Sequence, residues 1–166
     1  MSNSADVLRA LADCLSPQTE TRRGAESRIA TFSAARGFGA VLMQVLCTPS
    51  CGVGMRQMAA VVLRQAIVRD RWHALDADEK AYIREHLTGA LGDATRKIRS
   101  ATADVVSSIA RFDWPSEWPA LVPGLLALAR GSSGGGDAAA EGALCCLEMV
   151  VRGTSERDLG ALLAPV

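Results

Sequence analysis

Apolar residues recur at intervals of three and four along most of the chain, and turn-forming residues interrupt them at regular distances. This spacing places the apolar side chains on one face of successive amphipathic helices. This pattern places Val7, Leu8, Leu11 and Leu15 on the apolar face of the first helix, and Gly52 and Gly54 in a loop. The sequence predicts helices over 5–15, 17–35, 41–46, 55–71, 82–91, 94–110, 121–129 and 138–152, a flexible connector over 131–136, and one more helix starting at 154 or 155.

Four segments can be superposed as internal repeats, beginning at Arg23, Arg56, Arg99 and Glu141. Their starting points lie 33, 43 and 42 residues apart. The last two spacings match the period of about 40–47 residues in HEAT or armadillo arrays, where each helical hairpin packs on its neighbours. We therefore expect an all-α HEAT-repeat solenoid of four hairpins and the start of a fifth; the alternative is an irregular helical bundle. The predicted repeats are 4–35, 37–72, 76–112 and 115–152, with the next beginning over 154–166.

The composition supports a helical core and limits the classes of partner that the chain as a whole would attract. Hydrophobic residues make up 49% of the 166 positions but aromatic residues only 4%, a balance that favours helices over sheets. Equal numbers of basic and acidic side chains, 18 each, give no overall attraction to nucleic acid or membrane. The apolar runs are too short to span a bilayer, and the first 14 residues lack the apolar core of a signal peptide. We expect an intracellular chain whose five cysteines are reduced thiols.

Residues that could carry catalysis or hold a cofactor are scattered. Cys47 and Cys51 form a close pair, but a zinc ion would need about two more ligands, and both histidines are isolated. Two glycine-rich runs lack the preceding strand and the Lys-Ser/Thr pair of a phosphate-binding loop. The sequence therefore predicts no enzyme activity, no metal and no cofactor.

Several runs carry more specific information than the repeat pattern. They are Ala25-Glu26, Gly37-Phe38-Gly39, the helix from Met55 to Gln65 that ends at Trp72, Lys97-Ile98-Arg99-Ser100-Ala101, and Asp113-Trp114-Pro115-Ser116-Glu117-Trp118-Pro119-Ala120-Leu121. Together they resemble the amino-terminal region of importin-β-type nuclear transport receptors, the karyopherins, over almost the whole chain. Within that superfamily the resemblance is strongest to the importin-nine branch.

This resemblance implies a right-handed superhelix whose second helices line the concave face and bind Ran in its GTP-bound state. Because binding of Ran-GTP and of cargo is thermodynamically coupled, cargo taken up in the cytoplasm would be released in the nucleus. The receptor would shuttle between the two compartments, with nucleoporins contacting the full-length protein. The alternatives are an exportin of the same superfamily and a HEAT scaffold with no role in transport.

Helical periodicity selects the side chains of the second helices that lie beside the apolar face. In the second hairpin this stripe contains Val61 and Val68 as well as polar residues, and Thr31 lies at the corresponding place in the first. The predicted Ran-binding residues of the three hairpins are Arg28, Gln57, Arg64, Lys97, Ser100, Asp104, Ser107 and Arg111. For each of them alone, the alternative is an ordinary solvated position.

Other distinctive residues receive structural roles. Arg56 and Arg99 recur at equivalent repeat positions, and we expect them to fix the stacking of helices. We expect Trp114 and Trp118 to hold one hairpin on the next. Residues 1–75 carry a net charge of +4 and residues 76–166 of −4, which favours basic cargo such as histones or ribosomal proteins, unless these charges are merely scattered on the surface. The chain stops inside a helical pattern, so we expect a fragment of a longer receptor.

Overall fold

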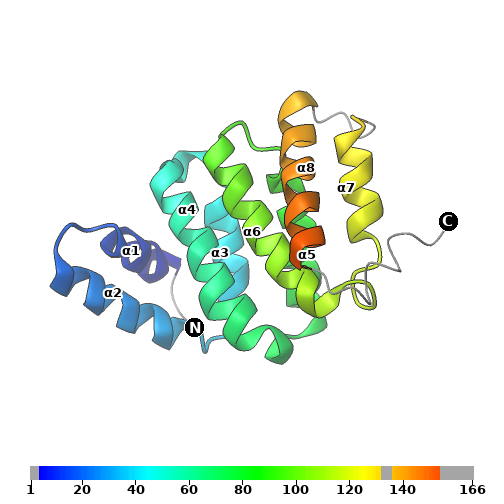
Figure 1. Ribbon diagram of the computed structural model, residues 1–166. Coiled ribbons are helices and arrows are strands. Elements are labelled where there is room, and N and C mark those ends of the chain that lie inside the picture. The colour runs from blue at the N-terminus through cyan, green and yellow to red at the C-terminus, as the bar shows by residue number, and fades with distance from the viewer. Residues whose placement is uncertain (1–3, 132–135, 154–166) are drawn as a thin grey trace. The chain divides into compact units, whose positions relative to one another are not determined.

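A computed structural model describes residues 4–131 and 136–153, and the regular structure within them is entirely helical (Figure 1). The predicted start of a fifth repeat, over 154–166, and most of the glycine-rich connector lie outside the described residues. The described residues form eight α-helices. They are α1 (Ser4–Cys14), α2 (Thr19–Phe32), α3 (Phe38–Cys47), α4 (Gly52–Val62), α5 (Ala77–Ala90), α6 (Arg96–Asp113), α7 (Leu121–Ala129) and α8 (Gly136–Gly153).

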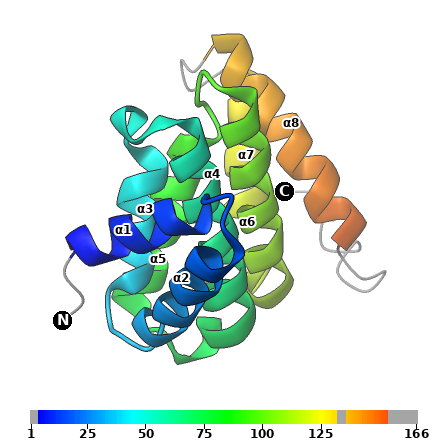
Figure 2. The ribbon, with the colours of Figure 1, turned by 90° about the vertical axis from the view of Figure 1, so that its left-hand side faces the viewer.

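The chain divides into two compact units, Met1–Ala90 and Leu91–Val166. In the first unit α1 packs on α2 (Figure 2) and also contacts α4, while α3 contacts both α4 and α5. Fully buried side chains from each helix, among them Leu11, Leu42, Leu63 and Leu87, form its core. The first helix buries the predicted Val7 and Leu11 together with Ala10, whereas the predicted Leu8 and Leu15 are 37% and 47% exposed.

In the second unit α8 packs on both α6 and α7. Ile98, Val105 and Ile109 of α6 are fully buried, as is Cys146 of α8. Gly142 brings α8 close to the chain at the start of this unit, because a Cβ atom at this position would overlap the carbonyl oxygen of Leu91. The short side chains of α8 therefore allow a tight helix contact.

Arginines at the starts of the second helices stabilise the preceding turns. Arg99, which is 7% exposed, donates to the carbonyl oxygens of Asp93 and Ala94 and forms an ion pair with Glu141. Arg56 is equally buried, and its Nε donates to the carbonyl oxygen of Leu46 at 2.7 Å. These contacts confirm the predicted structural role of both residues.

The first repeat is displaced by one residue from the predicted superposition. Arg22, not Arg23, makes the equivalent contact, donating to the carbonyl oxygens of Ser16 and Pro17 at 2.9 Å each. Arg23 is exposed and pairs only with Glu20 on its own helix. The displacement arises because adjacent arginines give the same sequence signal, while only one of them points back over the turn.

Glu79, near the start of α5, caps the start of α3. Its two carboxylate oxygens accept hydrogen bonds from the backbone N–H groups of Gly39, at 3.1 Å, and Gly37, at 3.2 Å. Gly37 adopts φ 81°, a left-handed conformation that glycine tolerates, and a Cβ on Gly39 would lie 3.0 Å from the carboxylate. The carboxylate therefore satisfies helix N–H groups that would otherwise be unpaired.

The structure of the long helix predicted over 55–71 differs from the prediction in two respects. It begins at Gly52, inside the predicted loop, after the short 3₁₀ turn η1 (Pro49–Cys51). Beyond α4 it continues as the π-helical segment η2 (Leu63–Arg69), followed by the 3₁₀ turn η3 (Trp72–Ala74). A π-helix closes its hydrogen bonds between residues five apart instead of four, so the faces beyond Val62 no longer follow the α-helical period.

Two further features bear on possible interaction sites. Trp118 is buried, so it is not an exposed binding anchor; its packing between hairpins stays a prediction.

No single helix among the described residues has the length and hydropathy of a membrane span. The segments Phe38–Cys47 and Pro49–Arg69 reach those values only together, across a bend of 88°.

Candidate functional site

The predicted stripe on the second hairpin is partly present on α4 and η2. Gln57 is half-buried, Val61 is 40% exposed, and Arg64 is exposed. The Arg64 guanidinium forms no ion pair or hydrogen bond with any part of the chain that the structure describes. A cationic side chain on a solvated helix face is therefore available to a partner at this position.

Val68 does not belong to this stripe, because only 1% of its surface is exposed. It lies in the π-helical segment, where the wider turn rotates position 68 into the core. Gln65 and Arg69 are exposed instead. The exposed face thus deviates from the α-helical period at the point where the helix type changes.

The residues predicted on the first hairpin are less accessible to a partner. Arg28 of α2 is half-buried, and its guanidinium is 2.5 Å from Asp13 of α1. Its Nε also faces the carbonyl oxygen of Gly24. Thr31 is exposed, and its hydroxyl donates to the carbonyl oxygen of Ser27. Arg28 therefore joins α1 to α2.

On α6 of the second unit, most of the predicted stripe is accessible. Lys97, Asp104 and Arg111 are exposed, and Ser100 is half-buried. Ser107 differs: it is only 9% exposed, and its hydroxyl donates to the carbonyl oxygen of Asp104 at 3.1 Å. The serine packs toward the core because its short side chain is satisfied by its own helix. Ser107 is therefore not available as a contact residue.

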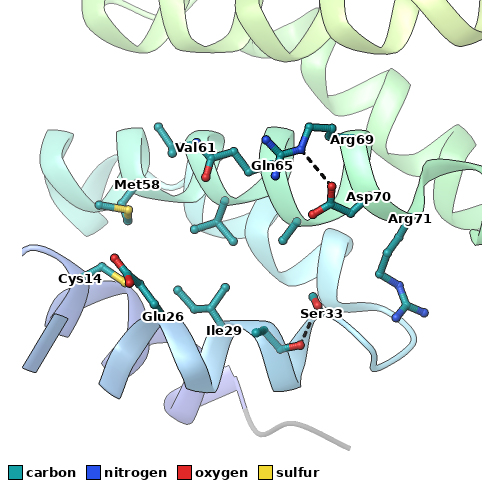
Figure 3. A pocket seen from close by; sticks show the side chains of 13 residues that line it. Cys14, Glu26, Ile29, Ser33, Met58, Val61, Gln65, Arg69, Asp70 and Arg71 are labelled. Carbon is teal, nitrogen blue, oxygen red and sulfur yellow. Dashed lines mark hydrogen bonds and ion pairs between the residues drawn. The ribbon is translucent and has the colours of Figure 1, made fainter. Parts of the chain in front are cut away.

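Three segments of the first unit enclose a groove of about 430 Å³ that the sequence did not predict (Figure 3). Ile29 and Ala30 of α2 form one side, and Met58 and Val61 of α4 form the other. The groove continues along η2 to Arg71. Its residues come from α1, α2 and the segment 58–71, so no local sequence motif could have identified it.

The thiols of Cys14 and Cys146 both have raised pKa values. Burial raises the pKa of the Cys146 thiol to about 12. Burial, followed by the nearby Glu26 carboxylate, raises the pKa of Cys14, which lines the groove. Both thiols are therefore poorer nucleophiles than an ordinary cysteine at neutral pH. Within the described ranges, no three His, Cys, Asp or Glu side chains are placed to hold a metal ion.

Comparison with known sequences relates the chain to a family of transport receptors. Residues 25–93 match the importin-β N-terminal domain. Importin-11 of Mus musculus is 28% identical over 130 residues, which cover 75% of this chain and 13% of the relative. Importin-9 of Drosophila melanogaster is 29% identical over 126 residues, which cover 69% of this chain and 12% of the relative. The chain thus spans about an eighth of the length of these relatives.

Comparison with solved structures confirms the all-α HEAT-repeat fold. A crystal structure of importin β has a TM-score of 0.84 at 22% identity, covering 95% of this chain and 20% of that one. The exportin Cse1, in its cargo-free cytoplasmic state, has a TM-score of 0.78 at 21% identity over 91% of this chain and 16% of its own. Kap95p, whose binding induces the switch loops of RanGDP to adopt the GTP-bound conformation, has a TM-score of 0.80 at 20% identity over 94% of this chain and 20% of its own.

Proposed function

Because residues 25–93 match the importin-β N-terminal domain and the relatives named above are importins, the chain belongs to the importin-β superfamily, and we propose that it binds Ran-GTP as part of a nuclear transport receptor. The family membership is the observation that carries this proposal. The structural likeness to Kap95p, a protein that binds Ran, supports it. The chain would supply the N-terminal part of the receptor's Ran-binding surface.

The polar faces of α4 and α6 are the proposed contact surfaces. Two cations on these surfaces, Arg64 on η2 just beyond α4 and Lys97 on α6, have no ion-pair partner in the described residues. Gln57, Ser100, Asp104 and Arg111 provide further polar groups. Many separate contacts of this kind can distinguish two nucleotide states of a partner, because only one state presents all its groups correctly.

The proposed receptor acts through binding equilibria alone, without a cofactor or covalent chemistry. Ran-GTP and cargo bind to the same receptor, so each changes the affinity of the other by the same factor. We propose import of basic protein cargo, such as histones or ribosomal proteins, in agreement with the net charge of −4 over residues 76–166. The receptor would shuttle between cytoplasm and nucleus and contact nucleoporins through regions beyond the proposed Ran surface.

Charge reversal tests the contact surfaces. Arg64→Glu combined with Lys97→Glu should weaken binding to Ran carrying a non-hydrolysable GTP analogue by about tenfold or more, or about 1.4 kcal/mol. Arg9→Glu combined with Arg130→Glu is the matched control, because it makes the same change in net charge at exposed positions of α1 and beyond α7. Titration calorimetry gives the affinities, and circular dichroism checks that helicity is retained. Equal affinities of the two double variants for Ran-GTP would show that these faces are not the Ran-binding surface.

Export is the second candidate, since the exportin Cse1 shares the fold. The sign of the coupling separates the two directions. In an importin Ran-GTP lowers the affinity for cargo, whereas in an exportin it raises it. The same titrations repeated at saturating basic cargo, such as a histone dimer, would therefore show weaker Ran-GTP binding under the proposal of import.

A further inference from the structure

The groove between α2 and α4 combines an apolar centre with opposite charges at its two ends (Figure 3). Met58 of α4 lies across the groove from Glu26, and Ile29 of α2 lies next to Glu26 toward its middle. Val61 also lines the groove, with 40% of its surface exposed. Glu26 lies at the end near Cys14, and Arg71 at the end near Ser33. Its volume of about 430 Å³ falls within the range of sites that hold ligands.

Both terminal charges lack partners in the described part of the chain. Glu26 forms neither an ion pair nor a hydrogen bond through its side chain there. The Nε atom of Arg71 is buried and has no hydrogen-bond acceptor. Buried donors are nearly always satisfied in folded proteins, so an unsatisfied one indicates a missing partner.

Three acidic residues that line pockets together with Arg71 already have partners. Asp70 pairs with Arg69 at 2.9 Å, and Asp76 pairs with Arg36 at 2.9 Å. The Glu79 carboxylate accepts the two N–H groups at the start of α3. Arg71 therefore has no hydrogen-bonded carboxylate partner among the described residues and is available to an acidic group of a ligand.

We propose that this groove binds a short linear peptide of a partner protein, with one bulky apolar side chain against Ile29 and Met58, a basic residue at Glu26 and an acidic residue at Arg71. Charge complementarity at both ends determines the direction of the peptide, and the apolar anchor supplies its contact area. The groove shares Val61 with the predicted Ran-binding stripe, whereas Gln57 and Arg64 do not line it.

The dimensions of the groove set the spacing of the three groups. Glu26 and Ser33 are seven residues apart on and just beyond α2, a distance of about 10 Å along the helix. An extended peptide covers this distance in about three residues, at about 3.3 Å each. The ligand therefore carries its basic and acidic residues three or four positions apart, with the apolar residue between them.

A selection experiment without Ran identifies the peptide and tests its fit. A displayed library of random seven-residue peptides is selected on the folded chain and, in parallel, on Ala30→Trp, which fills the groove from an exposed position. We expect enrichment on the unmodified chain of one apolar residue flanked by a basic and an acidic residue at the stated spacing. No such consensus, or the same consensus on Ala30→Trp, would overturn the proposal.

Charge exchange then tests the orientation with the selected peptide made synthetically. Glu26→Lys should weaken its binding about tenfold, and replacing the basic residue of the peptide by glutamate should restore the affinity. Glu20→Lys is the matched control, because Glu20 is exposed on the same helix outside the groove. Fluorescence anisotropy measures each affinity. An unchanged affinity of the Glu26→Lys variant for the peptide would contradict the proposal. So would self-association of the chain that Ala30→Trp abolishes, if no peptide binds.

Discussion

At the scale of single residues, the starts of helices depend on polar groups that lie far away in the sequence. Glu79 reaches back about 40 residues to cap α3, and Arg99 spans a similar separation to Glu141. Neither pairing follows from helical periodicity, which reports only on neighbours three or four positions apart. An acidic residue near the start of a helix generally stabilises that helix, yet the Glu79 carboxylate caps a different one, α3.

Removing the carboxylate of Glu79 should therefore destabilise the first unit. Glu79→Ala leaves the N–H groups of Gly37 and Gly39 without acceptors, and we expect the free energy of unfolding to fall by about 1–3 kcal/mol. Urea denaturation followed by circular dichroism measures the change. Glu85→Ala, at an exposed position of the same helix, is the control and should change stability by less than about 0.5 kcal/mol. Equal effects of the two substitutions would show that the cap is energetically irrelevant.

At the scale of helices, the pattern of apolar positions predicts the order of the elements well and their detailed geometry less well. The ranges of α6 and α8 follow the predicted segments closely, because long amphipathic stripes are strong signals. Val68 was expected on the exposed stripe and is buried, since a π-helical turn cannot be recognised from a 3.6-residue period. The groove that this segment helps to line was likewise not predictable.

Close packing between helices can outweigh helix propensity, and Gly142 of α8 tests this. Alanine is intrinsically better than glycine in a helix by about 1 kcal/mol. A Cβ at position 142 would nevertheless overlap the Leu91 carbonyl oxygen, so Gly142→Ala should lower the stability of the second unit by about 2 kcal/mol or more. Gly124→Ala in α7 is the matched substitution, because its Cβ would contact nothing within 4 Å. Thermal unfolding of both variants should give a lower midpoint for the first and an unchanged or higher midpoint for the second.

At the scale of the whole molecule, the repeat period and a few specific runs were sufficient to predict the fold and the family. The spacing between Arg56 and Arg99 indicated repeated hairpins, and both arginines have the predicted structural role. The set of Ran-binding residues remains a proposal. Ser107 is removed from the set because it is buried, and Arg28 is less accessible because it pairs with Asp13. Which exposed residues a partner contacts cannot be deduced from periodicity, because every solvated helix face has the same pattern.

Nucleotide-selective binding of Ran is the central claim, and one titration tests it directly. The unmodified chain is titrated calorimetrically with Ran loaded either with a non-hydrolysable GTP analogue or with GDP. The proposal predicts saturable binding of the GTP form and an affinity for the GDP form at least about tenfold lower, a difference of about 1.4 kcal/mol. Equal affinity for the two forms, or no binding of either, would contradict it.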